Sequence, residues 1–182
     1  MKILYIGQFT KGTTSRMRGL AIKEILCPNI FDVIDTNIPF FKTHRLLRSI
    51  GFRYKIGPLI ATINNYITAT SKNQHYDLIW VDKAVFITPK TTKLLKQKTL
   101  KLVHSTPDMA FYANKSKLFY ASLPLYDFCI TTKTIEIDIY HKYLQKSQVL
   151  FMPQGFSKEL HTPHHSFSQK EDAIVFIGLA EP

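Results

Sequence analysis

Apolar residues gather in short runs along the chain, each bounded by polar or turn-forming residues. Several runs are continuous rather than alternating, such as Ile-Leu-Tyr-Ile at 3–6 and Leu-Ile-Trp-Val at 78–81. Continuous apolar runs are typical of strands in a parallel sheet whose two faces are both covered by helices. The pattern therefore predicts strands at 2–7, 31–35, 77–81, 100–104, 127–131, 148–151 and 173–177.

The segments between these runs carry the signals that start and stop helices. Thr14 or Ser15 can cap a first helix, and Cys27-Pro28-Asn29 ends it. We expect helices over 15–26, over 39–70 with breaks near Gly51 and near Gly57-Pro58, from 89 onward, and over 134–144. Strands alternating with helices predict an α/β fold: a doubly wound, mostly parallel Rossmann-like sheet flanked by helices, with right-handed connections.

The final run, at 173–177, leads into a glycine just as the first run leads into Gly7. This repetition suggests the first strand of a second domain. We expect residues 1–155 to form one Rossmann-like domain and 156–171 to be a linker rich in Pro, His and Ser. Residues 172–182 would then open a domain that continues beyond the sequence.

The charge of the chain is high and uneven. Lys and Arg number 24 against 13 Asp and Glu, a formal net charge of +11, and no acidic residue lies between Asp35 and Asp77. Basic and apolar residues interleave in that stretch, and Arg45, Arg48 and Arg53 are its candidate binding residues. Membrane headgroups, an acidic glycan or nucleic acid would suit such a segment. The alternative is a solvated helix face over an ordinary core.

Other features of the sequence bear on the partners of the protein and on its location in the cell. No aromatic RNA-binding signature is present, so we do not expect nucleic acid as a partner. No apolar run approaches the roughly 18–20 residues of a membrane span, and the first residues do not resemble a signal peptide. We expect a cytoplasmic protein with possible peripheral contact at the inner face of an anionic membrane. Cys27 and Cys129 are expected to be two buried thiols rather than a disulfide.

Ligands of parallel α/β sheets bind beyond the carboxyl ends of the strands, where loop residues of this chain are small and polar. After the 2–7 strand, Gly12, Thr13 and Arg16 belong to a glycine-containing turn that enters a helix, an arrangement suited to a phosphate or carboxylate. Arg18 adds charge nearby. The spacing matches neither the Walker loop nor the dinucleotide fingerprint, and a tight turn with no ligand is the alternative. Lys83, which follows the 77–81 strand, is expected to bind an acceptor or a surface.

The sequence His104-Ser105-Thr106-Pro107-Asp108 contains the candidate catalytic residues. A histidine at a strand end can act as a general base near neutral pH, and Asp108 could orient it or serve in its place. The alternative is a histidine whose hydrogen bonds are purely structural. His161, His164 and His165 lie in a loop without a cysteine partner, which is poor spacing for zinc, so no metal is expected.

Several short motifs resemble the N-terminal half of GT-B glycosyltransferases, of the family-four or CgeB-like kind. The motifs are the opening strand at 2–7, the helix start at 15–20, Tyr-Asp-Phe-Cys-Ile-Thr-Thr-Lys at 126–133, Pro-Gln-Gly-Phe at 153–156, His-Thr-Pro at 161–163 and the strand at 174–178. The last three resemble the crossover between the two domains of that family.

The resemblance implies transfer of a sugar from a nucleotide sugar to a glycan or lipid-linked acceptor, with no other cofactor. It makes 1–155 the acceptor-binding domain, inactive alone, and places the donor nucleotide mainly in a second domain. The loop around Gly12 would face the donor phosphates, and His104 would occupy a position that often carries a catalytic or sugar-contacting histidine. Ser105 departs from the common His-Asp pair, so Asp108 takes part of that role. A non-enzymatic module that binds an anionic membrane or glycan through its basic face is the alternative function.

Overall fold

The apolar runs form the strands of a six-stranded, all-parallel sheet in the order β2-β1-β3-β4-β5-β6. This computed structural model describes residues 1–113, 115–155, 162, 165–169 and 171–173. The strands are β1 Lys2–Gly7, β2 Ile30–Asp35, β3 Tyr76–Asp82, β4 Thr99–Thr106, β5 Phe128–Thr131 and β6 Val149–Phe151. Six predicted strands and the α/β class are confirmed. The predicted strand 173–177 and most of the predicted linker lie outside the described residues.

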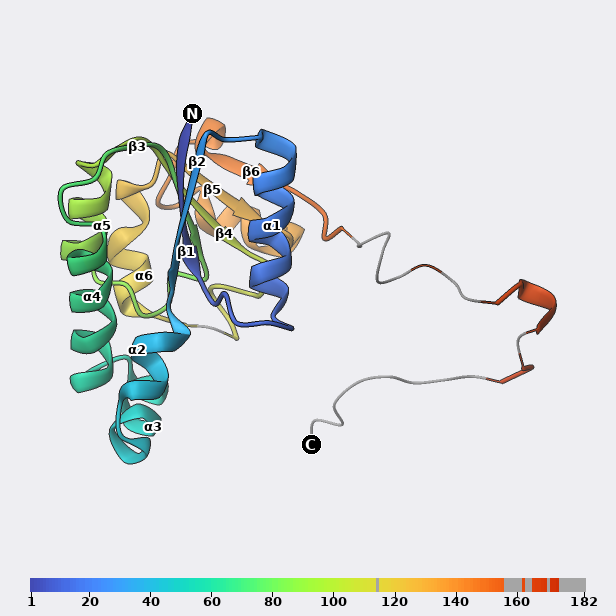
Figure 1. The fold of residues 1–182 in the computed structure, drawn as a ribbon, viewed down its shortest axis with the longest axis horizontal. Helices are drawn as coiled ribbons and strands as arrows, with labels where there is room; N and C mark the ends of the chain where they lie inside the picture. Colours follow the sequence, from blue (N-terminus) through green and yellow to red (C-terminus); the bar gives the residue numbers. More distant parts are fainter. Residues whose placement is uncertain (114, 156–161, 163–164, 170, 174–182) are drawn as a thin grey trace.

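Helices cover both faces of the sheet, unequally (Figure 1). One face carries α1 Thr14–Leu26, and the other carries α4 Pro58–Thr70, α5 Pro89–Lys96 and α6 Lys117–Ser122. The main core lies under α4–α6, where Leu4, Ile79 and Leu102 from three neighbouring strands are fully buried. Burial of these side chains is the main force that holds the layers together.

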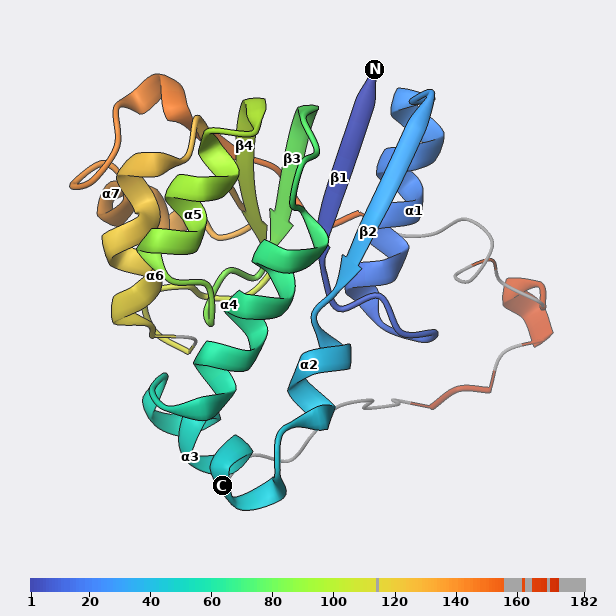
Figure 2. The same cartoon turned by 60° about the vertical axis from the view of Figure 1, so that its left-hand side comes forward.

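The connection from β2 to β3 contains two more helices, α2 Asn37–Lys42 and α3 Arg45–Tyr54. Figure 2 shows them beyond the carboxyl end of β2, outside the layers of the sheet. The predicted break near Gly51 is wrong, because α3 runs through it. A Cβ at Gly51 would lie 2.5 Å from Leu59 Cβ, so the glycine allows α3 to pack against α4. The chain breaks instead at Thr43-His44, and the predicted break at Gly57 is confirmed by its φ of +78°.

Three smaller predictions are also corrected. Thr13, rather than Thr14 or Ser15, caps α1 through its side chain. The predicted helix over 134–144 is reduced to a 3-10 turn, Thr134–Glu136, and α7 Ile137–Tyr140. Both cysteines are free, but only Cys129 is buried. Cys27 is exposed, because it takes a left-handed conformation (φ 41°) that ends α1 at the surface.

Candidate functional site

The strand order reverses direction between β1 and β3. The chain leaves β1 toward β2 and later returns to the other side of β1, so the loops that follow β1 and β3 diverge. Ligands of open parallel sheets bind at such a switch point. Gly7 and Asp82 are the last residues of these two neighbouring strands, so the candidate site lies around them.

A buried ion pair joins α1 to this switch point. Arg18 donates from Nε to Asp82 Oδ1 (3.0 Å) and from Nη2 to Oδ2 (2.9 Å). The Asp82 side chain is 0% exposed and that of Arg18 is 25% exposed. Burial lowers the pKa of Arg18, but the hydrogen bonds and the charge of Asp82 outweigh it and raise the pKa, so the guanidinium stays charged. Two parallel hydrogen bonds of this kind fix geometry as well as charge.

Close packing surrounds that pair. A Cβ at Gly7 would lie 2.8 Å from Ser15 Oγ and 3.0 Å from Asp82 Cβ, so only glycine fits at this strand end. The Tyr5 hydroxyl donates to the Ser15 carbonyl (2.7 Å). Burial, followed by the nearby charge of Asp82, raises the pKa of Tyr5, so the phenol stays protonated. The α1 side of the switch point is therefore filled by protein atoms.

A second ion pair lies one residue further along the chain. Lys83 has a left-handed backbone (φ 57°), and its N–H donates to the Ser105 carbonyl (3.0 Å). Its Nζ lies 2.9 Å from Asp108 Oδ2, and the two side chains are 30% and 38% exposed. The Asp108 N–H donates to Thr106 Oγ1 (3.2 Å), which fixes the loop after β4. This pair stands at the surface of the carboxyl edge.

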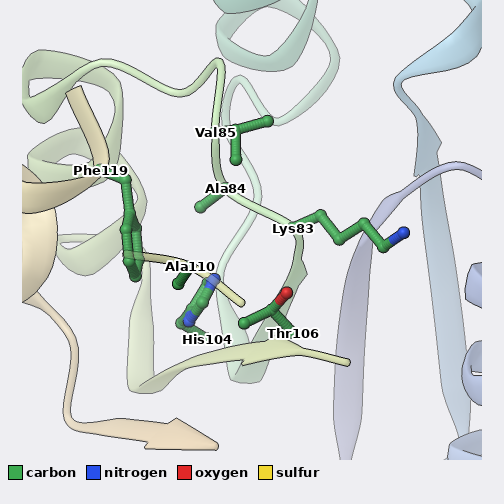
Figure 3. A pocket seen from close by; sticks show the side chains of 7 residues that line it. All are labelled: Lys83, Ala84, Val85, His104, Thr106, Ala110 and Phe119. Carbon is green, nitrogen blue, oxygen red and sulfur yellow. The ribbon is translucent and has the colours of Figure 1, made fainter. Parts of the chain in front are cut away.

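His104 lies on the opposite face of the sheet from Asp82, under a small pocket (Figure 3). Its ring centre lies 4.5 Å from that of Phe119, with the two rings tilted by 39°, and no described residue provides a hydrogen-bond partner for its buried Nδ1. Burial lowers the pKa of His104 to about 3, so the imidazole is neutral at pH 7. The pocket holds about 30 Å³, space for about one water molecule or one hydroxyl group. Lys83 lines its rim and points away from the histidine.

The two predicted catalytic residues therefore lie near the same edge but do not form a pair. Asp108 binds Lys83, whereas His104 is enclosed by aromatic rings. The catalytic role of each stays a prediction.

The predicted anion-binding residues form the start of α1. Thr13 Oγ1 accepts from the N–H of Arg16 (3.3 Å), and the Arg16 guanidinium lies over the Phe9 ring at 5.7 Å. Gly12 has a φ of +88° and open space around it. Arg18, rather than Arg16, reaches the switch point. Their anion-binding role stays a prediction.

A second, open hollow of about 380 Å³ lies between the loop after β1 and helix α2. Asp35 shapes it by accepting from the N–H groups of Phe9 and Asn37, each at 2.9 Å. The hollow is lined by Thr10, Asp35, Asn37, Ile38, Phe41 and Lys42. Arg45, Arg48 and Arg53 lie on α3, away from the switch point.

Two buried polar residues that sequence reasoning missed hold the loops of the site. Asn64 on α4 donates to the Phe86 carbonyl (2.9 Å) and accepts from the Thr88 N–H (2.9 Å), which fixes the loop after β3. Glu136, fully buried, accepts from the N–H groups of Ala110 (3.1 Å) and Phe111 (2.8 Å), which fixes the loop after β4. The available signal for the first was its position, because Asn64 falls on the apolar face of α4 with Ile60 and Ile67.

No family model matches the chain, and no curated protein matches it. Within the described part of the chain, no three His, Cys, Asp or Glu side chains gather as metal ligands would. His161 and His164 lie outside that part.

Proposed function

We propose that this chain is the acceptor-side domain of a GT-B-type glycosyltransferase, which transfers a sugar from a nucleotide sugar to a glycan or lipid-linked acceptor. The observation that carries the proposal is the half-exposed Lys83–Asp108 pair at the carboxyl edge of a parallel sheet, directly beside the switch point. Residues at this edge can line a ligand-binding cleft, because the loops that follow several strands converge there.

Sugar transfer to a hydroxyl group requires a base that accepts its proton. Asp108 suits that role better than Asp82, because its carboxylate reaches the surface while that of Asp82 is fully buried and held by Arg18. Lys83 would orient the Asp108 carboxylate and place a positive charge where the leaving diphosphate develops negative charge. Fixed charges aimed at developing charge are a major source of rate enhancement.

His104 would have a different part in the same proposal. As a neutral imidazole whose Nδ1 has no partner among the described residues, beside a pocket of about 30 Å³, it suits a hydrogen bond to one inserted hydroxyl group. Such a contact fixes orientation and selects among sugars, because a site that pairs a hydroxyl rejects an analogue that lacks it.

The test measures sugar transfer by the full product of the gene that encodes this chain, from a panel of nucleotide sugars to glycan and glycolipid acceptors. We expect Asp108→Asn to lower kcat by about a hundredfold or more, as loss of a general base does. Asp77→Asn is the matched control, because Asp77 is an exposed carboxylate near the opposite end of strand β3. Transfer at the wild-type rate in Asp108→Asn, or no transfer by the wild-type protein, would contradict the proposal.

A further inference from the structure

Helices α2 and α3 with their flanking turn form a projection at the carboxyl edge of the domain, here called the α2–α3 projection (residues 37–56). In Figure 2 it extends past the end of β2, and its tip has no other element of the domain beyond it. It packs against the domain on one side, where the rings of Phe40 and Phe52 contact the ring of Phe86. The buried residue of α3 is Gly51, which lies against Leu59 of α4.

The apolar stripe of α3 faces solvent instead of the core. Leu46, Ile50 and Tyr54 recur every four residues and so lie on one side of the helix. Their side chains are 69%, 49% and 62% exposed. An amphipathic helix of a globular domain normally turns such a stripe inward. Further large apolar side chains are exposed in the same projection: Ile38, Phe41, Leu47, Phe52 and Ile56.

Positive charge borders that stripe. Arg45 and Arg53 precede Leu46 and Tyr54 by one residue, so they form a neighbouring row on α3. The Arg48 guanidinium lies 5.2 Å from the Phe41 ring centre, and the projection contains no acidic residue. This surface combines exposed apolar side chains with positive charges and no negative ones. It therefore complements a partner that is apolar inside and anionic at its surface.

We propose that the α2–α3 projection docks on a lipid bilayer with anionic headgroups, with the stripe of α3 buried at the interface and its arginines among the headgroups. Helices of this composition lie in the plane of the membrane interface, and long basic side chains reach from there to the headgroups. Nucleic acid would use the cations but leave the apolar stripe exposed to water. None of the described helices is both long and apolar enough to cross a membrane.

Docking through this projection brings the carboxyl edge of the sheet close to the membrane, because both lie at the same end of the domain (Figure 2). The candidate site would then face ligands that the bilayer presents. The docking itself rests on the α2–α3 projection alone, so it is independent of whether the domain takes part in sugar transfer.

The test is vesicle flotation of the full chain with phosphatidylcholine vesicles, and with vesicles of phosphatidylcholine and phosphatidylglycerol in equal amounts. We expect binding to the anionic vesicles that weakens as salt rises. The triple variant Leu46→Ser, Ile50→Ser, Tyr54→Ser and the double variant Arg45→Gln, Arg53→Gln should each weaken it by at least about tenfold. All five side chains are exposed, so both variants should fold as the wild type does. Circular dichroism checks this.

Matched controls lie on other helices. Leu20→Ser with Ile25→Ser removes two exposed apolar side chains from α1, and Lys90→Gln with Lys93→Gln removes two exposed cations from α5. Both controls should bind anionic vesicles as the wild type does. Equal binding to neutral vesicles, equal losses in the controls, or undiminished binding by either α3 variant would overturn the proposal. So would a wild-type dimer that the triple variant dissociates while vesicle binding is absent.

Discussion

Two ion pairs start from neighbouring residues at the end of β3, and they differ in almost every physical respect. Asp82 faces α1, where Arg18 holds it by two hydrogen bonds and its side chain is 0% exposed. Lys83 turns the other way through a left-handed backbone and meets Asp108 at 2.9 Å, with both side chains partly exposed. Two residues that are adjacent in the chain thus belong to two different kinds of ion pair, one buried and one at the surface.

The difference in burial means that separating the two pairs has different costs. Separating a buried pair leaves a charge without solvent or partner, which is costly, whereas an exposed pair contributes little and can exchange its partner for a ligand. Arg18–Asp82 therefore joins α1 to the sheet, and Lys83–Asp108 is the pair at which we propose that a ligand binds.

The largest effect should follow loss of the buried pair. We expect Asp82→Ala to lower the free energy of unfolding by about 3 kcal/mol, because Arg18 keeps its charge in a mostly buried position. Urea denaturation measures this value. Asp138→Ala, which removes an exposed carboxylate from α7, is the control and should change it by less than about 1 kcal/mol.

A double variant sharpens that result. Arg18→Met with Asp82→Leu removes both charges and should cost less than Asp82→Ala alone, because no buried charge remains unpaired. A cost for Asp82→Ala no greater than that of the Asp138 control would show that the pair does not hold α1.

An intermediate effect should come from His104, which is buried like Asp82 but lies against the rings of Phe119 and Tyr126. An unfolded histidine binds a proton near pH 6.5, and burial lowers the pKa of folded His104 to about 3. Between those values the unfolded state holds more protons, so stability decreases as the pH falls. From pH 7 to pH 5 the loss should be about 2 kcal/mol.

The measurement compares urea denaturation at both pH values for the wild type and for His104→Leu, which keeps a similar volume without the titrating group. The variant should lose less stability on acidification than the wild type. His75→Leu, at an exposed position, is the control. Identical pH dependence in wild type and His104→Leu would show that water or another partner already satisfies the imidazole.

The sequence predicted the sheet well because the strands are continuous apolar runs that only a parallel sheet buries on both faces. It also predicted where β1, β2, β5 and β6 end, and so the edge of the sheet near which Lys83 and Asp108 lie. The predicted end of β4 is wrong, because this strand runs through Thr106, so His104 lies inside the strand rather than in the loop after it. The sequence did not predict which face each side chain takes, because that depends on the register between strands. His104 aligns with Val81, on the core face, and so lies opposite to Asp82.

The partners of the site residues were harder to predict. Arg16 and Arg18 are the same residue type two positions apart, so the sequence alone does not show which of them reaches Asp82. The orientation of α1 about its own axis determines this. Ser15 and Gly19, four residues apart, are the buried residues of that helix, and Arg18 lies on the same side. Two small residues at that spacing indicated the packed face. Glu136 gave no comparable signal, because its backbone partners lie 25 and 26 residues away along the chain.

The smallest effect on stability should follow loss of the surface pair. We expect Lys83→Met to change the free energy of unfolding by about 0.5 kcal/mol, because solvent screens the Lys83–Asp108 pair and its side chains lose freedom on pairing. Urea denaturation beside Asp82→Ala makes the comparison direct. In the sugar-transfer assay, by contrast, the same substitution should lower kcat/KM at least about tenfold, since it removes the cation that orients Asp108. A stability loss as large as that of Asp82→Ala would make Lys83–Asp108 a second structural pair and remove the reason to place ligand binding there.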